Sequence, residues 1–483
     1  MSQGTGLTQT HITSGHYNNK QTEGRSTSTL PHNHTTMKRT YIIALCMASA
    51  TIATAQQQLS LDQVKQLALE HNMAMRSADN AIKQAKEQQK EAFTNYFPQV
   101  SATGAGFKTN RDMVKASVST ADLLPASLAQ VIPEQLAAAI PSTIPVSMVN
   151  KGVITGATAV QPVFMGGQIV NGNKLAKVGV EASELQRRAT QNTVELTAEQ
   201  YYWQIISIKE KQKTLDAVAA MLDKLNSDAT VAVKAGVGMR NDLLQVQLKQ
   251  NEVESNRLKL DNALKLSQMV LAQYIGMEGK DIDVSALVDP AQLPAAPTIK
   301  VDHDQAVTAT PEYQLLQKNV EASALQRKME AGKLLPSVAV GAGYNYSDMG
   351  SGMDSHLGMV FATVSVPISS WWGGSHAVKR RKLAEQNARE QLTDNTQLLK
   401  IRMQKDWNDV DDAYKQLVLA KKSIEQSEEN LRLNRDYYHA GTVTMNDLLT
   451  AQQQYQQSRD RYTDAYAQLQ VKMLEYRQST GRE

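Results

Sequence analysis

The residues of this chain that could support chemistry are a few histidines, one run of carboxylates and two short glycine-rich segments. The histidines beyond residue 55 are widely scattered: His71, His303, His356, His376 and His439. They do not show the spacing of metal ligands. Residues 104–106 and 341–343 both read Gly-Ala-Gly, without the third glycine of a dinucleotide-binding loop. Asp409, Asp411 and Asp412 could form an acidic site, but a solvated helix surface explains them better. We therefore expect no enzyme, no catalytic residue, no metal site and no cofactor.

A targeting segment lies near the N-terminus. Residues 37–39 read Met-Lys-Arg and are followed by an apolar stretch at 41–48. Residues 53–55 read Ala-Thr-Ala, which fits the small-x-small pattern that a signal peptidase cuts. The apolar stretch is too short to span a bilayer, so removal is expected rather than anchoring. The pattern predicts a signal peptide at 37–55.

The start and the single cysteine of the chain are interpreted together with this signal. Residues 1–36 are polar and precede the signal, so we interpret Met37 as the true start; a genuine N-terminal tail is the alternative. Leu45, not a small residue, precedes Cys46, which argues against lipidation of that cysteine. The predicted mature chain starts at Gln56 and contains no cysteine. Disulfides, thiol catalysis and Cys-ligated zinc are thereby excluded.

The composition of the 483 residues is that of long helices, not of compact globular domains. The chain is 41% hydrophobic but only 5% aromatic, and its formal net charge is +3. Ala, Leu and Val are interspersed with Gln, Lys and Glu, a mixture typical of helices that share narrow contacts. No charged patch of the kind that binds nucleic acid is evident. After the signal no stretch reaches 18 apolar residues, so any later membrane span must consist of strands.

The chain is a tandem duplication. Residues 236–244 align with 441–449 at a shift of 205 positions, and the same shift takes Gly276 onto Gly481. Two further pairs of landmarks occur in the same order: 161–167 with 366–374, and 97–106 with 335–343. Repeats of this kind define the architecture, because each copy should fold in the same way.

Each copy is predicted to contain two long helices joined by a glycine turn. In the second copy, apolar residues recur every seven positions: Met403, Val410, Leu417, Ile424, Leu431 and Tyr438, then Leu448, Tyr455, Tyr462, Leu469 and Tyr476. This period predicts coiled-coil helices with a left-handed supercoil. The first copy is weaker, because Gln250, Arg257 and Ser267 interrupt the pattern. Roughly 67 residues of helix at about 1.5 Å each reach about 100 Å, which suits a rod or the wall of a tunnel.

Four strand-like stretches precede the long helices, two in each copy. Val338, Val340 and Ala342 alternate with other residues, as do Val360, Ala362 and Val364. Each stretch is about ten residues, the length that a tilted strand needs to cross a bilayer. One pair is joined by a short turn and the other flanks a long insertion: 347–355 and 111–150. Trp371-Trp372 is expected to end a strand at the membrane interface.

The organisation predicted from these patterns has five parts. They are an N-terminal extension at 1–36, a signal peptide at 37–55, a first repeat at 56–276, a connecting segment at 277–311 and a second repeat at 312–483. The predicted strands are about 98–110, 151–165, 336–347 and 356–369, and the predicted long helices are 168–235, 241–275, 375–440 and 446–480. The fold class is mainly α with a transmembrane β part. Four strands cannot close a barrel, so copies must associate, with two copies giving eight strands and three giving twelve.

The chain resembles the TolC-type outer-membrane efflux protein family over nearly all of residues 59–481. The resemblance rests on the duplicated frame, on Pro98 and Pro336 opening strands, and on the turn motifs at 235–244 and 438–449. It implies a homotrimer in the outer membrane, with a twelve-stranded β-barrel and a periplasmic α-barrel of twelve helices. The implied function is export of small molecules or polypeptides by tripartite efflux or type I secretion, together with a periplasmic adaptor and an inner-membrane transporter.

The resemblance also implies where the adaptor and the gate would be. The adaptor-contact tips would include Gly236, Val237, Gly441 and Thr442. Each glycine would end a long helix in the left-handed conformation, and the following Asn-Asp pair would cap the next helix.

The periplasmic gate would involve Asp447, Asp242 and Tyr438. Asp447 matches the first position of a ring of aspartates, and the alternative is that it only caps the returning helix. Val443 stands where relatives have arginine, and Thr450 where they have a second aspartate, so the gate is expected to lack one salt bridge.

A periplasmic coiled-coil adaptor or scaffold protein is the alternative to a channel. It would share the heptads and the export signal. The duplicated strand pairs argue against it, because an adaptor would carry separate β-domains. The cargo, whether drug, metal ion or polypeptide, is chosen largely by inner-membrane partners that this chain does not encode.

Overall fold

The fold is described here from a computed structural model, over the residues 57–111, 114–119, 141–148, 151–290, 292–349 and 354–482. The predicted extension at 1–36, the signal peptide at 37–55 and the start at Gln56 lie outside these residues. The same holds for most of the insertion at 111–150 and for the centre of the turn at 347–355. Everything below concerns the unit that begins at Gln56.

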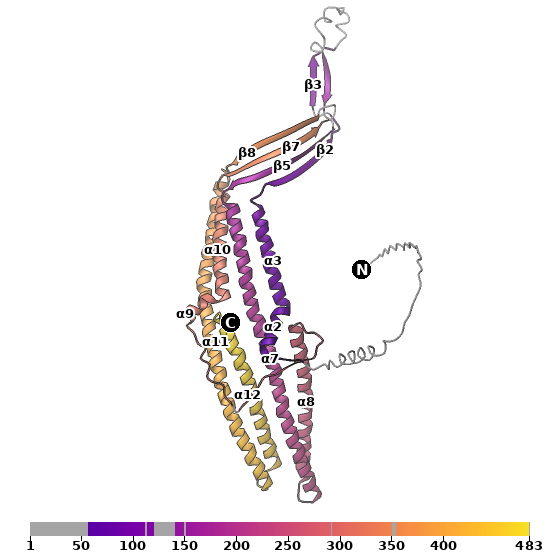
Figure 1. Cartoon of the computed structure of the whole chain (residues 1–483), viewed down its shortest axis with the longest axis vertical. Coiled ribbons are helices and arrows are strands. Elements are labelled where there is room, and N and C mark those ends of the chain that lie inside the picture. The colour runs from indigo at the N-terminus through magenta and orange to yellow at the C-terminus, as the bar shows by residue number, and fades with distance from the viewer. Residues whose placement is uncertain are drawn as a thin grey trace, which may run out of the picture. The chain divides into compact units, whose positions relative to one another are not determined.

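The two repeats share the series helix, strand, strand, long helix, helix, to which the first repeat adds α2, β3 and β4 (Figure 1). The first comprises α2 (Leu61–His71), α3 (Met73–Thr94), β2 (Gln99–Lys108), β3 (Val114–Ser119), β4 (Thr143–Met148), β5 (Lys151–Met165), α7 (Gln168–Lys234) and α8 (Arg240–Tyr274). The second comprises α10 (Pro311–Gly332), β7 (Ser337–Asp348), β8 (Asp354–Ser365), α11 (Ser370–His439) and α12 (Met445–Ser479). Long helical hairpins and four long strands confirm the predicted fold class.

The helices form one layer whose composition changes along its length. Next to the strands, α3 packs on α7, α7 on α10 and α10 on α11. Farther from the strands, α8 packs on α7, α7 on α12 and α12 on α11. The 67-residue α7 and the 70-residue α11 run through both parts. The heptad residues explain this packing, since the side chains of Val410, Leu417 and Tyr462 are fully buried between the helices.

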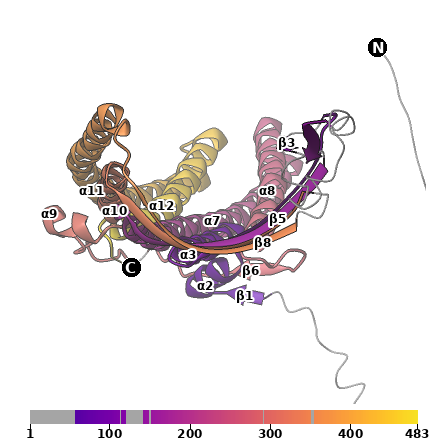
Figure 2. The same ribbon diagram turned by 90° about the horizontal axis from the view of Figure 1, so that it is seen from above.

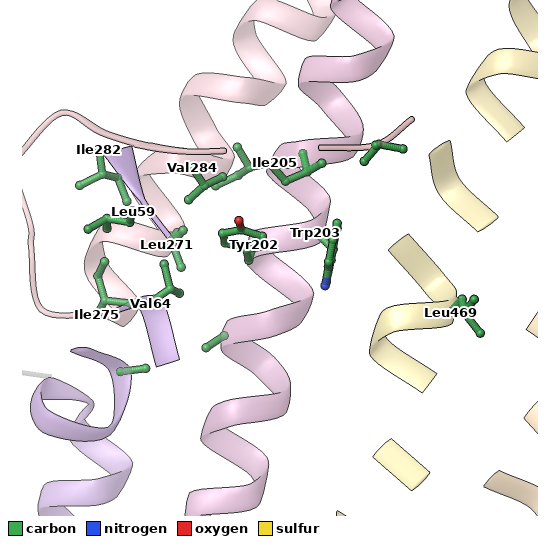
Figure 3. Packing of buried hydrophobic residues seen from close by; sticks show 14 of the residues in the cluster. Leu59, Val64, Tyr202, Trp203, Ile205, Leu271, Ile275, Ile282, Val284 and Leu469 are labelled. Carbon is green, nitrogen blue, oxygen red and sulfur yellow. The ribbon is translucent and has the colours of Figure 1, made fainter. Parts of the chain in front are cut away.

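A hydrophobic core ties the N-terminal elements to the long helices. Leu59, Val64 and Ile282 belong to the same buried cluster as Tyr202 and Leu271 (Figure 3). A short parallel pairing of β1 (Gln57–Leu59) with β6 (Ile282–Val284) places Leu59 opposite Val284, another member of this cluster. The core therefore holds the connecting segment against α7 and α8.

The long strands form one antiparallel sheet in the order β2-β5-β7-β8. Alternating side chains give it two different faces. One face is apolar: Val100, Ala102, Ala157, Ala159, Val338, Val340, Ala342, Val360, Ala362 and Val364. The opposite face is richer in Ser, Thr and Asn, although it also carries Met359 and Phe361. The sheet is curved in the view from above, with α2, β1 and β6 on its convex side (Figure 2). Within the described residues, β2 and β8 have a strand partner on one side only.

The junction of the second sheet hairpin with its helix differs from the prediction. The strand ends at Ser365, and Trp371 and Trp372 lie in the first turn of α11, which begins at Ser370 and not at 375. Pro367 explains the difference, because it has no N–H to extend the ladder. Its carbonyl instead accepts the Ser370 N–H at 3.1 Å, which starts the helical turn.

The paired glycines of the two repeats also differ. Gly166 and Gly167 have φ of +59° and +76° and form the turn before α7. Gly373 and Gly374 lie inside α11 instead. A Cβ on Gly374 would come within 2.1 Å of Leu334, so this glycine allows α10 and α11 to approach closely.

Several short elements were not predicted. The insertion expected as a loop contains the antiparallel pair β3 and β4. The connecting segment contains β6, the helix α9 (His303–Ala306) and the 3₁₀ turn η1 (Val307–Ala309). Among the described residues, no helix is both long enough and apolar enough to cross a membrane.

Candidate functional site: the helix-hairpin tips

Both glycine turns end a long helix in the same way. Gly236 and Gly441 have φ of +77° and +70°, directly after the last helical residues of α7 and α11. The next N–H groups close each turn: Val237 donates to the Ala232 carbonyl at 3.0 Å, and Thr442 donates to the Tyr437 carbonyl at 2.9 Å. This is the pattern of a glycine-terminated helix, in which the left-handed residue satisfies the last carbonyls.

The returning helices are capped differently from the prediction. The capping residue of α12 is Thr444, and Asp447 completes a capping box with it. The Asp447 carboxylate accepts the Thr444 backbone N–H at 2.9 Å and its hydroxyl at 2.7 Å. In α8 the capping position is Met239, which has no side-chain acceptor. The Asn-Asp pairs therefore occupy the second and third helical positions, where a carboxylate favours the positive end of the helix.

The two tips together line one open groove. Six of the seven residues predicted from the resemblance line it: Val237, Asp242, Tyr438, Gly441, Thr442 and Asp447. Gly236 does not. The remaining wall residues come from the last turns of α7, the end of α11, the two connecting turns and the start of α12: Leu225, Asp228, Ala229, Ala232, Gly238, Met239, His439, Val443, Thr444 and Met445.

The groove is acidic. Asp228, Asp242 and Asp447 line it, and none of its lining residues is Arg or Lys. Burial, followed by the charges of Asp242 and Asp228, raises the pKa of the Tyr438 hydroxyl. The hydrogen bonds from Thr444 lower the pKa of Asp447, so its carboxylate is ionised at neutral pH. Val443 lines the groove but supplies no compensating charge.

Asp228 is a groove residue that the sequence patterns did not indicate. It lies on α7, three residues after Leu225 and one before Ala229, on the face that turns toward the groove. Heptad position could have indicated it, because this face continues the seam of α7. The motifs drew attention only to residues near the glycine turns.

A buried core supports the groove from within the hairpins. Leu222, Val246 and Leu448 are each 0% exposed, and Met445 is 1% exposed. They belong to one hydrophobic cluster shared by α7, α8, α11 and α12. The tips are therefore held in position by helix packing, not by the turns alone. Among the described residues, no group of three or more His, Cys, Asp or Glu side chains could hold a metal ion.

Comparison with known proteins follows the architecture described above. Residues 304–482, which cover the second repeat, match the family model described as outer membrane efflux protein. No curated protein sequence matches the chain.

Several solved structures share the fold at low sequence identity. One is a structure of CusC from a study of its folding and transmembrane channel formation. It has a TM-score of 0.71 at 14% identity, and the match covers 88% of this chain and 92% of the CusC chain. The outer membrane protein VceC from Vibrio cholerae has a TM-score of 0.66 at 14% identity, covering 87% and 96%. The open state of the MtrE outer membrane channel of Neisseria gonorrhoeae has a TM-score of 0.67 at 14% identity, covering 87% and 89%. The second repeat therefore matches the outer membrane efflux protein family, and the chain as a whole shares the fold of these solved outer-membrane channels.

Proposed function

We propose that three copies of this chain form one efflux channel across the outer membrane and the periplasm. Three sheets of four strands would close a barrel of twelve strands, and three helical layers would continue it as a tunnel of twelve helices. The observation that carries this proposal is the open sheet, whose edge strands β2 and β8 lack a second partner in the part of the chain described. Unpaired edges are not tolerated in lipid, so closure by other copies is required.

The two sheet faces fit this arrangement. The face with Val340, Ala342 and Val360 is apolar, and Val360 is 87% exposed in the single chain. Contact with lipid would cover such residues at no cost in hydrogen bonds. The face richer in Ser, Thr and Asn would then line the channel.

The helical layer supports association of copies as well. Its outer helices carry exposed apolar side chains, including Leu248, Leu258 and Met269 on α8 and Leu398, Ile401 and Leu419 on α11. An exposed apolar stripe at both edges of a layer is best covered by the neighbouring edge of another copy. Joining α8 or α3 of one copy to α11 of the next would extend the layer around the tunnel.

The groove at the tips would serve as the periplasmic end of this tunnel. Val237 and Thr442 lie on the outermost turns and are exposed, which suits contact with a periplasmic adaptor. Asp447, Asp242 and Tyr438 would form the gate, with three copies of each around one axis. An inner-membrane transporter would supply the cargo, in tripartite efflux or in type I secretion.

The test is assembly, location and conductance of the intact protein. Envelope fractionation is expected to place the chain in the outer membrane, and unheated samples should migrate as trimers in detergent gels. The purified trimer should conduct ions in planar bilayers, and cells lacking the protein should lose tolerance to exported toxic compounds. A monomer in the periplasmic fraction with no conductance would contradict the proposal and would favour an adaptor or scaffold.

A further inference from the structure

Each repeat carries three lysines near the sheet, and the two on the long helix lie somewhat farther from the strands in the second repeat than in the first. The shift of 205 residues that relates the glycine turns also takes Lys174 onto Lys379 and Lys177 onto Lys382. A third lysine precedes the strand-opening proline by eight residues in both repeats, Lys90 before Pro98 and Lys328 before Pro336. We name these sets the first lysine triad (Lys90, Lys174 and Lys177) and the second lysine triad (Lys328, Lys379 and Lys382).

Both triads lie just beyond the ends of the long strands. Helix α7 begins at Gln168, three residues after β5 ends at Met165. At about 1.5 Å per residue, Lys174 and Lys177 lie about 9 Å and 14 Å along the helix. A bilayer adds roughly 5–8 Å of headgroup region on each side of its hydrocarbon core, and a lysine side chain spans most of the remaining distance. The ammonium groups of Lys174 and Lys177 can therefore reach the level of lipid phosphates. In α11, which begins at Ser370, Lys379 lies about 14 Å along the helix, as far as Lys177 does in α7, and Lys382 lies about 18 Å along it.

The first triad borders an open pocket between α3 and α7. Lys90, Lys174 and Lys177 line it together with the exposed side chains of Phe93, Tyr96 and Val170. The rings of Phe93 and Tyr96 are 5.5 Å apart, and Phe93 is 54% exposed. Exposed aromatic rings beside cations are typical of the boundary between hydrocarbon and headgroups, where a ring has one apolar and one wet side.

The second triad has its own aromatic residues. Trp371 and Trp372 lie in the first turn of α11, and Trp372 is 77% exposed. Trp371 Nε1 donates to the Leu334 carbonyl at 2.9 Å, which fixes this turn to the end of α10. Lys379 is seven residues after Trp372 and therefore lies on the same side of the helix, two turns farther from the sheet.

The charge of these lysines is largely uncompensated within the chain. Lys174, Lys328, Lys379 and Lys382 are exposed, and none of them forms a hydrogen bond or an ion pair with the described residues. Residues 168–180 and 370–384 contain no Asp or Glu.

Two triad lysines, Lys90 and Lys177, have acidic partners among the described residues. Lys90 pairs with Glu87 at 2.8 Å, and Lys177 lies 3.8 Å from Glu181. The lysine side chains in these pairs are 73% and 69% exposed, so water weakens both contacts and a phosphate can displace them.

We propose that the two lysine triads bind the phosphate groups of anionic phospholipids at the periplasmic surface of the outer membrane. The aromatic residues beside them enter the acyl boundary, while the lysines hold the headgroup. Each chain offers two such sites, and a trimer offers six around the barrel. The inference depends on the proposed function, because that function places the sheet in the membrane. The competing partner for the lysines is the acidic surface of a neighbouring copy.

The test uses the full chain, purified in detergent, and native mass spectrometry with phosphatidylglycerol or phosphatidylethanolamine. The test variant combines Lys174→Gln, Lys328→Gln, Lys379→Gln and Lys382→Gln. The matched control combines Lys224→Gln, Lys234→Gln, Lys259→Gln and Lys265→Gln, four exposed helical lysines far from the strands, with the same change of charge. Each lysine near a phosphate contributes about fivefold in affinity. The wild type and the control should prefer phosphatidylglycerol. The test variant should lose at least about fivefold of that preference, because it removes one lysine from the first triad and all three from the second.

Three other outcomes would overturn the inference. Equal binding of the two lipids by the wild type, or an unchanged preference in the test variant, would show that the lysines do not recognise anionic lipid. The test variant could also fail to form trimers while the double variant Lys379→Gln/Lys382→Gln keeps both its trimers and its lipid preference. That result would assign the lysines to contacts between copies. Absence of the wild type from the outer membrane would contradict the proposed function separately, because lipid preference in detergent does not depend on cellular location.

Discussion

Asp447 and Thr444 hold each other in place at the tip of the second hairpin. The Asp447 carboxylate accepts the backbone N–H and the hydroxyl of Thr444, while the Asp447 N–H donates to the Thr444 hydroxyl oxygen at 3.2 Å. The carboxylate is nevertheless exposed and lines the groove. One side chain can therefore cap α12 and still present its charge to the groove.

We expect Asp447→Asn to change ion selectivity. Three copies of this carboxylate on the channel axis would raise the local concentration of cations, and Val443 supplies no compensating charge. The purified variant in planar bilayers should show a lower cation preference and weaker block by trivalent cations than the wild type. If the variant forms a folded trimer with unchanged ion selectivity and unchanged block by trivalent cations, Asp447 does not form a ring of carboxylates at the channel opening.

Thr444→Ala is the matched control for this experiment. It removes the hydroxyl that receives the Asp447 N–H but keeps the carboxylate, so selectivity should stay near that of the wild type. Loss of such a cap costs about 1 kcal/mol of helix stability. Because hydrogen bonds lower the pKa of Asp447, its stabilising effect is present above the unfolded pKa and is lost as the pH falls through the folded one. In the wild type, the stability of the tip should therefore be lost at a pH below the usual pKa of a free aspartate carboxylate.

Sequence patterns predicted the parts of the fold that depend on repetition. Val410 and Leu417 repeat every seven residues and are fully buried, because the helix period itself selects them for the seam. Gly236 and Gly441 share a motif and share the left-handed conformation, because only glycine adopts it readily. Six residues of the groove could likewise be predicted, since they flank those two turns.

The junctions could not be predicted from periodicity. The alternation of Val364, Val366 and Ile368 continues beyond Ser365, so the pattern does not show where β8 ends. The turn after Pro367 decides it, through backbone hydrogen bonds that no side-chain period encodes. The pairing of β1 with β6 joins strands of three residues, too short to show a period of two.

Gly441→Val should disturb the tip while leaving the barrel intact. Gly441 has φ of +70°, where a β-branched residue is strained by about 1–3 kcal/mol. The turn should shift or fray, and contact with the adaptor should weaken. Cells with this variant should keep normal trimer levels in the outer membrane and lose drug tolerance.

A control for this variant exists within α11. A Cβ on Gly373 would meet no atom within 4 Å, so Gly373→Ala should leave efflux unchanged. Full drug tolerance of Gly441→Val cells at normal trimer levels would show that this turn does not dock the adaptor.

Gly332→Ala should weaken the junction between α10 and the start of α7. A Cβ on Gly332 would lie 2.3 Å from the Gly166 carbonyl oxygen, which belongs to the backbone and cannot rotate away. Overpacking of this kind costs about 1–3 kcal/mol. The yield of heat-resistant trimers is expected to fall. Gly179→Ala in α7 is the comparison, because its Cβ would meet nothing within 4 Å, and that variant should equal or exceed the wild type in yield. Equal yields of both variants would show that the backbone segments at Gly332 and Gly166 can separate enough to accept the added Cβ.

Asp460 is the residue expected to make the helical layer sensitive to pH. It lies on α12, where burial and, to a lesser extent, the charge of Asp464 raise its pKa to about 6, against the opposing effect of Lys211. Asp460 Oδ1 is buried and has no hydrogen-bond partner among the described residues. Its neighbour Asp464 is engaged with α7, accepting from Ser207 at 2.6 Å and from Lys211 at 2.8 Å. The charged form of Asp460 is therefore disfavoured at the contact between α12 and α7.

The sign of the pH effect follows from the raised pKa. Folding favours protonated Asp460, so its contribution is complete below the unfolded pKa near 4 and is lost as the pH rises through about 6. Allowing for solvent at this partly exposed group, the free energy of unfolding should fall by about 1–2 kcal/mol from pH 5 to pH 8. Asp460→Asn should remove this part of the pH dependence and should unfold at a higher urea concentration than the wild type at pH 8. Asp412→Asn changes an exposed carboxylate on α11 and should keep the wild-type slope. A slope in Asp460→Asn equal to that of the wild type would show that another group is responsible for the pH dependence.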